Sequence, residues 1–237
     1  MQSPFTNIPP VVKNLLIINI ICFIPSLVFT HGFNTDYDPV AVYGGLHYFN
    51  SPSFGVWQIL TYMFMHGGWA HIFFNMFALF SFGPILEYTV GSKRFFNLYF
   101  ICGIGAALIQ LLVQAYEVHH IMGSFTIAGA SPTLNVDQAS ITKLQDIYSS
   151  STVGASGAIF GVLIAFGMLY PNMELMILFI PVPVKAKYII PVYCLFEVFM
   201  GVGQFAGDNV AHFAHIGGAV FGFLVVKSWR LQTSENR

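Results

Sequence analysis

Charged residues are scarce in this sequence of 237 residues: they make up 8% of the chain, whereas hydrophobic residues make up 56% and the mean hydropathy is +0.70. A soluble domain carries about 25% charged residues, so this chain cannot cover itself with a water-facing surface. The composition excludes a soluble globular domain and predicts an integral membrane protein. There is also no basic face or stripe, which argues against nucleic-acid binding.

Cysteine is equally sparse. Cys22, Cys102 and Cys194 each fall in a different apolar segment, and an odd number of such thiols argues against a disulfide framework and against a metal cluster. The adjacent imidazoles of His119 and His120 have no cysteine or carboxylate pair nearby, so we expect them to be solvated. No metal ion and no other cofactor is therefore expected.

Six apolar segments predict an all-α membrane protein, a six-helix transmembrane bundle that forms a single domain over residues 1–237. A full span needs about 20 residues, and the apolar segments that begin at Ser156 and at His215 are both shorter than that. A long outer loop is expected at 117–151 and a polar tail at 230–237. The spans are predicted at about 11–30, 70–88, 95–116, 156–170, 188–203 and 211–229.

Two connecting segments carry weaker signals. Within the outer loop, Ile141, Leu144 and Tyr148 have helical spacing, which would allow a helix lying on the surface. Glu174–Val184 holds a short apolar run and two prolines, and we interpret it as a connecting loop.

Basic residues indicate how the bundle is oriented. If the amino terminus is cytoplasmic, Lys143 alone of the nine basic residues falls outside, which is a strong positive-inside pattern that also places the carboxyl terminus inside. The amino terminus shows neither a signal-peptide cleavage site nor a transit-peptide pattern. We expect a multi-pass protein of a bacterial cytoplasmic (inner) membrane. The cytoplasmic basic residues would be Lys13, Lys93, Arg94, Lys185, Lys187, Lys227, Arg230 and Arg237.

Two polar residues lie at matching depths in the two short segments. Ser156 lies 15 residues, or about 22 Å, before the helix stop at Pro171, and His215 lies 14 residues, or about 21 Å, before Trp229. On the second span, His71 reaches a similar depth, and Asn75 follows one helical turn deeper on the same face. A nucleophile and a base in one layer below the membrane surface point to hydrolysis.

Glycine spacing supports a close approach of the two short segments. Gly157 and Gly161 on one, and Gly218 and Gly222 on the other, form small-xxx-small pairs that let helix backbones touch. Taken alone, such spacing is usually a packing device, and a single histidine near a helix end is usually interfacial. Ionisable groups inside a membrane are nevertheless costly and indicate function, and here four polar groups converge on one layer.

These motifs resemble the rhomboid family of intramembrane serine proteases, from about Trp57 to Gly222. The GxSG motif is Gly154-Ala155-Ser156-Gly157, the HxxxN motif spans His71–Asn75, and the HxxGxxxG motif spans His215–Gly222. The resemblance implies a rhomboid-like bundle with Ser156 as nucleophile and His215 as general base, a pair that requires no carboxylate. His71, Asn75 and the Ser156 N–H would form the oxyanion hole. The substrates would be transmembrane segments of other proteins, met within the lipid bilayer.

Some positions depart from the family pattern. Trp57-Gln58 stands where Trp-Arg is frequent, and Phe160 stands where a tyrosine often packs on the catalytic histidine, so stacking is expected without a hydroxyl. His212, one turn before His215, is a competing base, although the small residues after His215 favour the latter.

Two other functions stay open. One is a catalytically silent protein of the same fold that binds membrane-protein clients. The other is a small secondary transporter, for which Glu197 in the fifth span is the main argument, although neither inverted repeats nor a second buried acid accompany it. We interpret Glu197 instead as a protonated acid bonded inside the bundle.

Overall fold

The computed structural model describes residues 8–32, 34, 37–126, 137–177, 180–203 and 210–232, and these are mostly helical. Four helices are long and apolar enough to cross a membrane: α1 (Pro10–Phe29), α4 (Trp69–Val90), α5 (Ser92–Met122) and α8 (Ala186–Gly203). Two further apolar helices, α7 (Ser156–Leu169) and α9 (His212–Ser228), are shorter. The chain is a multi-pass membrane protein. The count of six spans stays a prediction, because it depends on α7 and α9.

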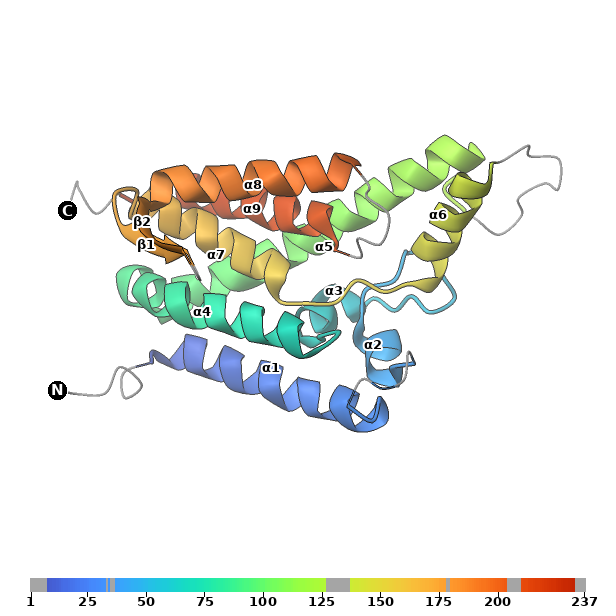
Figure 1. The fold of residues 1–237 in the computed structure, drawn as a ribbon, viewed down its shortest axis with the longest axis horizontal. Coiled ribbons are helices and arrows are strands. Elements are labelled where there is room, and N and C mark those ends of the chain that lie inside the picture. Colours follow the sequence, from blue (N-terminus) through green and yellow to red (C-terminus); the bar gives the residue numbers. More distant parts are fainter. Residues whose placement is uncertain are drawn as a thin grey trace.

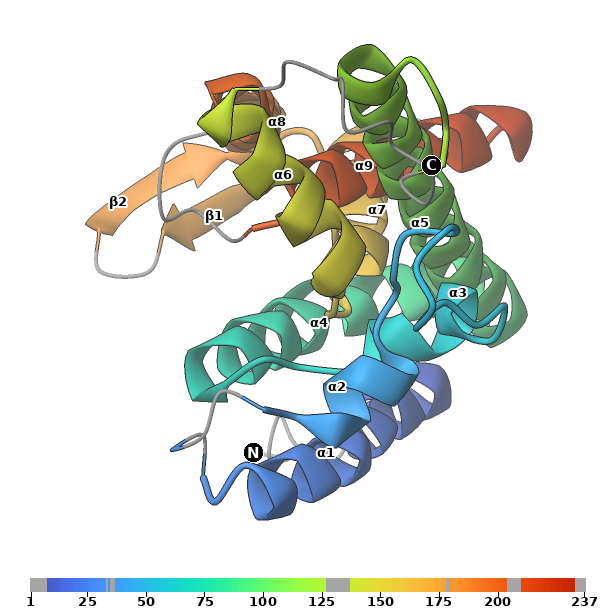
Figure 2. The same ribbon diagram turned by 90° about the vertical axis from the view of Figure 1, so that its right-hand side faces the viewer.

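Helix α7 runs through the middle of the bundle (Figure 1). It packs most extensively against α9 and α5 and also contacts α4 and α8, while α1 contacts α4 at the edge of the bundle remote from α8. Seen from the end in Figure 2, α5 and α9 cross to the right of α6 (Gln138–Ser149), and α1 and α4 lie in the lower half of the view. The shortest of the apolar helices is thus the one enclosed by the others. Of its residues, Ala158, Val162 and Phe166 are fully buried or nearly so.

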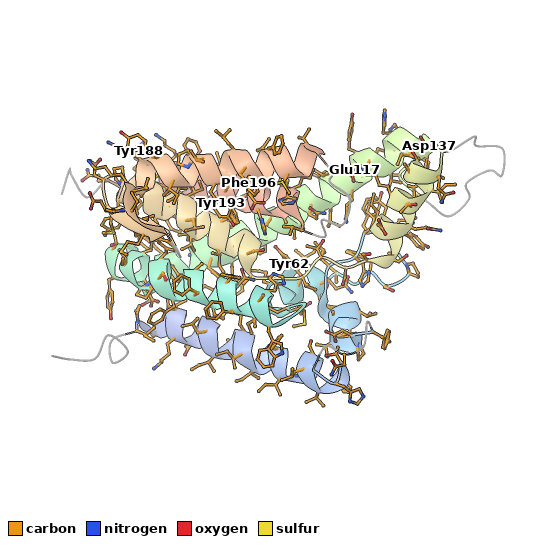
Figure 3. All side chains as sticks on the ribbon, viewed as in Figure 1. Tyr62, Glu117, Asp137, Tyr188, Tyr193 and Phe196 are labelled. Atoms are coloured by element: carbon orange, nitrogen blue, oxygen red, sulfur yellow. The ribbon has the colours of Figure 1, made fainter. Side chains whose placement is uncertain are left out.

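The lateral faces of the long helices are covered with large apolar side chains. Ile21 on α1, Phe73 on α4 and Phe196 on α8 are each more than half exposed, and Figure 3 shows Phe196 among the side chains that surround the bundle. Such surface would be unfavourable in water and is the surface that lipid requires. The labelled charged residues Glu117 and Asp137 lie beyond one end of the bundle in the same view.

Basic residues gather at the other end. Helix α1 begins, α5 begins and α9 ends at that end of the bundle (Figure 1), which brings Lys13, Lys93 and Lys227 to one side. Lys143 lies on α6 at the opposite end, where its Nζ is 2.8 Å from Glu117 Oε1. Arg237 lies outside the described residues. This segregation is the one that the positive-inside pattern predicts, and the side of the membrane that each end faces stays a prediction.

A buried carboxylate holds the start of α1 against α4. Glu87, 2% exposed, accepts hydrogen bonds from the backbone N–H groups of Val11 at 3.0 Å and Val12 at 2.8 Å and from the Ser92 hydroxyl at 2.7 Å. The first N–H groups of a helix have no partner within it and carry partial positive charge, so an acceptor from a neighbouring helix satisfies both. No sequence pattern indicates this role for Glu87.

Between α1 and α4 the chain forms a compact cap. It contains α2 (Pro39–Gly44), α3 (Gln58–Thr61) and the 3₁₀ turn η1 (Tyr62–Phe64). Gln58, fully buried, accepts from the His47 N–H and donates to the carbonyls of Tyr43 and Ser53. Where an arginine is frequent in similar sequences, this chain therefore has an amide that ties three parts of the cap together.

Most of the described part of the predicted outer loop 117–151 is helical. Helix α5 extends past the predicted end at Tyr116 to Met122, where Gly123 ends it with a φ of +67°, a left-handed conformation typical of helix ends. The surface helix suggested by spacing exists as α6, but it packs through Leu144 and Ile147 onto Tyr48 and Val118, and Ile141 is exposed. Asp137 caps α6 by accepting from the Ser140 N–H, which lowers the pKa of that carboxyl.

The segment after α7 is not the irregular loop that we predicted. It forms a two-stranded antiparallel ribbon, β1 (Glu174–Ile177) and β2 (Ile180–Lys185), with Glu174 opposite Lys185. Two prolines led to the loop prediction because proline cannot donate to a sheet ladder. In a ribbon of two strands both strands are edges, and prolines are tolerated there.

Candidate active site

Two backbone contacts with the cap fix the turn before α7. Leu46 and Thr152 form an antiparallel bridge, and the Gly154 N–H donates to the Tyr62 carbonyl at 2.9 Å. Gly154 has a φ of +127°, which side-chain-bearing residues rarely adopt. This turn delivers Ser156 as the first residue of α7, where the free N–H groups of a helix start are available.

Helices α7 and α9 meet backbone to backbone. A Cβ added at Gly218 would overlap the Gly157 carbonyl, and one added at Gly222 would meet the Gly161 carbonyl at 2.5 Å. The close approach predicted from the two glycine pairs is therefore confirmed. Because the two backbones are in contact, short side chains near the starts of both helices can touch.

The contact joins Ser156 and His215. His215 Nε2 lies 2.7 Å from Ser156 Oγ, a normal hydrogen-bond length, and the Phe160 ring stacks on the imidazole at a centroid separation of 4.5 Å and an interplanar angle of 10°. The stacking expected of Phe160 is thus present. The Phe160 ring limits rotation of the imidazole, and the Ser156 hydroxyl is hydrogen-bonded to one of the two imidazole nitrogens.

His71 faces the same turn from α4, and Asn75 lies one helical turn further along that helix. The Gly67 N–H donates to His71 Nδ1 at 3.4 Å, so the proton of a neutral ring belongs on Nε2. That Nε2 is the atom that a Cβ at Gly154 would meet first, at 2.6 Å, with Ser156 Oγ at 3.5 Å. Asn75 is 6% exposed, and its Nδ2 has no hydrogen-bond partner among the described residues. His71 therefore offers a donor beside the serine, and Asn75 offers a buried donor one helical turn further along α4.

A carboxylate completes the arrangement, which sequence reasoning missed. Glu197 Oε2 on α8 lies 2.8 Å from His215 Nδ1 and 2.6 Å from His212 Nδ1. Glu197 is bonded inside the bundle, as expected, but its partners are two imidazoles on the same oxygen. A single carboxyl proton could serve only one of them, so the contacts favour an ionised carboxylate over the protonated acid that we expected. Of the two candidate bases, His215 is the one bonded to the Ser156 hydroxyl, whereas His212 is bonded to the Glu197 carboxylate. The i, i+3 spacing of the two histidines, which puts them on one face of α9, was the available signal.

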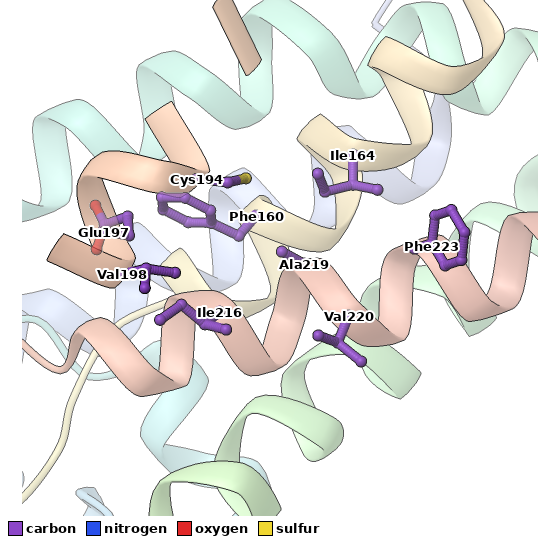
Figure 4. A pocket seen from close by; sticks show the side chains of 9 residues that line it. All are labelled: Phe160, Ile164, Cys194, Glu197, Val198, Ile216, Ala219, Val220 and Phe223. Atoms are coloured by element: carbon purple, nitrogen blue, oxygen red, sulfur yellow. The ribbon is translucent and has the colours of Figure 1, made fainter. Parts of the chain in front are cut away.

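Beside this cluster lies a cavity of about 270 Å³ between α7, α8 and α9 (Figure 4). Phe160 and Glu197 line it near the cluster, and its remaining wall is apolar except for the Cys194 thiol. Glu197 is the only carboxylate in that lining, and its Oε2 contacts the two histidines.

The backbone contact at Gly218 leads to a first prediction. Gly218→Ala should reduce any activity that depends on the Ser156–His215 contact by about 10²-fold, because the methyl forces α7 and α9 apart and a misplacement of about 1 Å costs that much. The measurement is the turnover of purified protein in lipid vesicles. Ala219→Val, the neighbouring change toward the cavity, is the control and should leave turnover within about twofold. Equal turnover in both variants would contradict a required close approach.

Comparisons with known proteins agree with the motifs. Residues 53–230 match the model of the Rhomboid domain. The chain is 28% identical over 216 residues to Rhomboid protease AarA of Providencia stuartii, which covers 89% of this chain and 69% of that protein. It is 30% identical over 169 residues to RHOMBOID-like protein 4 of Arabidopsis thaliana, covering 71% of this chain and 33% of that protein.

A third relative is Rhomboid protease GluP of Bacillus subtilis, 28% identical over 167 residues, covering 70% of this chain and 25% of that protein. The chain thus spans most of the first relative but a third or less of the other two. The matched Rhomboid domain contains His71, Ser156 and His215.

Proposed function

This chain belongs to the rhomboid family, and from that premise we propose that it is an intramembrane serine endopeptidase. It hydrolyses peptide bonds in or near the transmembrane segments of other membrane proteins, with Ser156 as nucleophile and His215 as general base. The observation that carries the proposal is the 2.7 Å separation of His215 Nε2 and Ser156 Oγ. A serine hydroxyl is a weak nucleophile until a neighbouring base accepts its proton.

The reaction follows from this contact. His215 Nε2 takes the Ser156 proton while Oγ attacks the carbonyl carbon of the scissile bond, and the carbonyl oxygen becomes an oxyanion. The protonated imidazole then gives its proton to the leaving amine, and an acyl-serine forms. Water, deprotonated by His215, releases the carboxylate product and restores the serine.

Donors for the oxyanion surround Ser156. The Nε2–H of His71, the amide of Asn75 and the backbone N–H at the start of α7 are the three groups that we assign to it. Preorganised donors of this kind are worth about 2.7–4 kcal/mol each where measured in a serine protease. The buried Asn75 amide supports the assignment, because a donor without a partner in the free enzyme is otherwise costly.

The substrate must present an extended peptide bond to Ser156. A peptide bond inside a helix offers its carbonyl to the helix ladder, so we expect cleavage where small or helix-weakening residues allow local unwinding. No cofactor takes part, and the enzyme meets its substrates in the bilayer. We propose the bacterial cytoplasmic membrane as its location on the basis of the basic-residue pattern. Relatives at similar identity also occur in plants and in yeast mitochondria.

The proposal is tested by reconstitution. Purified protein in vesicles is mixed with a single-span reporter whose span contains small residues, and the fragments are identified by mass spectrometry. We expect cleavage in or beside the span, at a rate proportional to enzyme. Binding of the reporter without any fragment would instead support the catalytically silent alternative. The transporter interpretation loses its main argument, because Glu197 is engaged by two histidines beside Ser156.

A further inference from the structure

We propose that Glu197 is a positioning residue for His215, so that this chain carries a serine–histidine–glutamate triad where the family resemblance implies a serine–histidine pair alone. The inference rests on the proposed function. It assigns a role to a residue that the resemblance does not cover. Its basis is an unbroken line of polar contacts from α8 through α9 to α7.

The line has two short links through a single ring. Glu197 Oε2 lies 2.8 Å from His215 Nδ1, and His215 Nε2 lies 2.7 Å from Ser156 Oγ. Glu197 is 4% exposed, so its carboxylate is largely shielded from water. The carboxylate and the hydroxyl therefore contact the two different nitrogens of one imidazole, which is the arrangement of a catalytic triad.

The first consequence concerns the tautomer of His215. An ionised carboxylate can only accept hydrogen bonds, so Glu197 requires the proton of a neutral imidazole to sit on Nδ1. Nε2 then carries a lone pair, and that nitrogen faces the Ser156 hydroxyl. A ring with its proton on Nε2 would present a donor to the serine and could not act as base. Glu197 thus selects the competent form.

The second consequence concerns charge. When His215 takes the serine proton it becomes a cation inside the bundle, where charges are poorly solvated. The hydrogen bond from a neutral Nδ1–H to an ionised carboxylate then becomes an ion pair, and the attraction between the two opposite charges adds to the bond. This added attraction exists only once the imidazolium forms, which is the condition for it to raise the rate.

His212 secures the carboxylate. Its Nδ1 lies 2.6 Å from the same Oε2, and its ring is perpendicular to that of His215 with centroids 6.3 Å apart. A carboxylate oxygen has two lone pairs, and two Nδ1–H donors occupy both. His212 therefore anchors Glu197 in the rotamer that reaches His215. Its contact with Glu197 makes it a support for the base rather than a competitor.

The same atoms could in principle bind a cation, since ligand atoms of Glu197, His212 and His215 all lie within 4.8 Å of one another. Hydrogen-bond distances of 2.6 and 2.8 Å favour protons between the atoms. A metal on His215 Nδ1 would also place a full positive charge beside the base and weaken it. The experiment therefore includes metal analysis.

The test compares two substitutions of opposite kind in vesicles with a cleavable reporter. Glu197→Gln keeps the shape and removes the charge, whereas Glu197→Asp keeps the charge and shortens the side chain. We expect Glu197→Gln to lower kcat about 10²-fold with KM unchanged, within the range of acid–base contributions, because its amide can donate to His215 and favour the wrong tautomer. Glu197→Asp should retain more activity than Glu197→Gln. A role in packing alone predicts the reverse order.

The pH–rate profile is the second readout. Loss of the carboxylate removes the counter-charge of the imidazolium, so the acid limb of kcat should move to lower pH in Glu197→Gln. The other titratable groups that face this pair are His71 on α4, His212 on α9, and Tyr193 and Cys194 on α8. His212→Ala should therefore be profiled in parallel. It should lower kcat less than Glu197→Gln does and move the limb in the same direction.

Glu87→Gln is the matched control, because Glu87 is an equally buried carboxylate that accepts hydrogen bonds far from His71 along α4. It should lower the thermal midpoint but leave kcat per folded enzyme and the pH profile unchanged. An unchanged kcat and pH profile in Glu197→Gln would overturn the proposed triad and would leave the proposed protease function standing. Stoichiometric bound zinc that is lost in Glu197→Gln would also overturn it. If the wild type and Ser156→Ala are equally inactive, the proposed function itself fails.

Discussion

Ser156→Ala should reduce reporter cleavage by at least about 10⁴-fold, the scale on which loss of a serine nucleophile acts in serine proteases. Alanine removes the Oγ that lies 2.7 Å from His215 Nε2 and leaves the N–H groups of α7 in place. The fold should survive, because the substitution removes the hydrogen bond to His215 whereas the α7–α9 contact is made by glycine backbones. The measurement is the initial cleavage rate in vesicles.

Ser81→Ala provides the control for this substitution. Ser81 lies on α4, and its hydroxyl donates to the Phe77 carbonyl of its own helix, so its loss removes the same atom without touching the site. Cleavage by this variant should match the wild type. A Ser156→Ala variant that is folded and cleaves at the wild-type rate would remove Ser156 from the mechanism.

Asn75→Ala has the second-largest expected effect. We expect a fall in kcat of about 10²- to 10³-fold, equivalent to about 2.7–4 kcal/mol, as for loss of one oxyanion donor elsewhere. KM should stay unchanged, because the developing negative charge exists only in the transition state. The resting enzyme should lose little stability, since the Asn75 Nδ2 has no partner among the described residues. The measurement is a full rate-against-substrate curve.

Asn19→Ala is the corresponding control. Asn19 is a fully buried amide on α1 whose Nδ2 donates to the Leu15 carbonyl, so its loss affects packing and not the serine. We expect a lower thermal midpoint and an unchanged kcat per folded molecule. A kcat for Asn75→Ala equal to that of Asn19→Ala would contradict a role in the oxyanion hole.

Much of the site could be predicted because its signals are local. Depth counted along helices brought Ser156 and His215 to one layer, and the glycine pairs predicted the backbone contact that the structure confirms. The place of His71 beside Ser156 followed from its depth on α4, and the role of Asn75, one turn further on the same face, stays a prediction. Each of these inferences needs only the geometry of a single helix and the thickness of a membrane.

What could not be predicted depends on contacts between distant segments. The role of Glu197 requires knowing which face of α8 meets α9, and an isolated acid in a span gives no such information. Glu87 accepts hydrogen bonds from Val11 and Val12, which lie 76 and 75 positions earlier in the chain. No pattern in the sequence near Glu87 indicates that it holds the start of α1. The β1–β2 ribbon was missed because prolines weaken strand signals whether or not the strand lies at an edge.

The central claim is that Ser156 is a nucleophile activated by His215, and covalent labelling tests it most directly. Wild-type protein in vesicles is treated with a serine-reactive fluorophosphonate and digested, and the modified residue is identified by mass spectrometry. The account predicts a single phosphonylated serine at Ser156, with labelling strongly slowed in His215→Ala. Protein that remains unlabelled at Ser156, or that is labelled equally fast without His215, would contradict it.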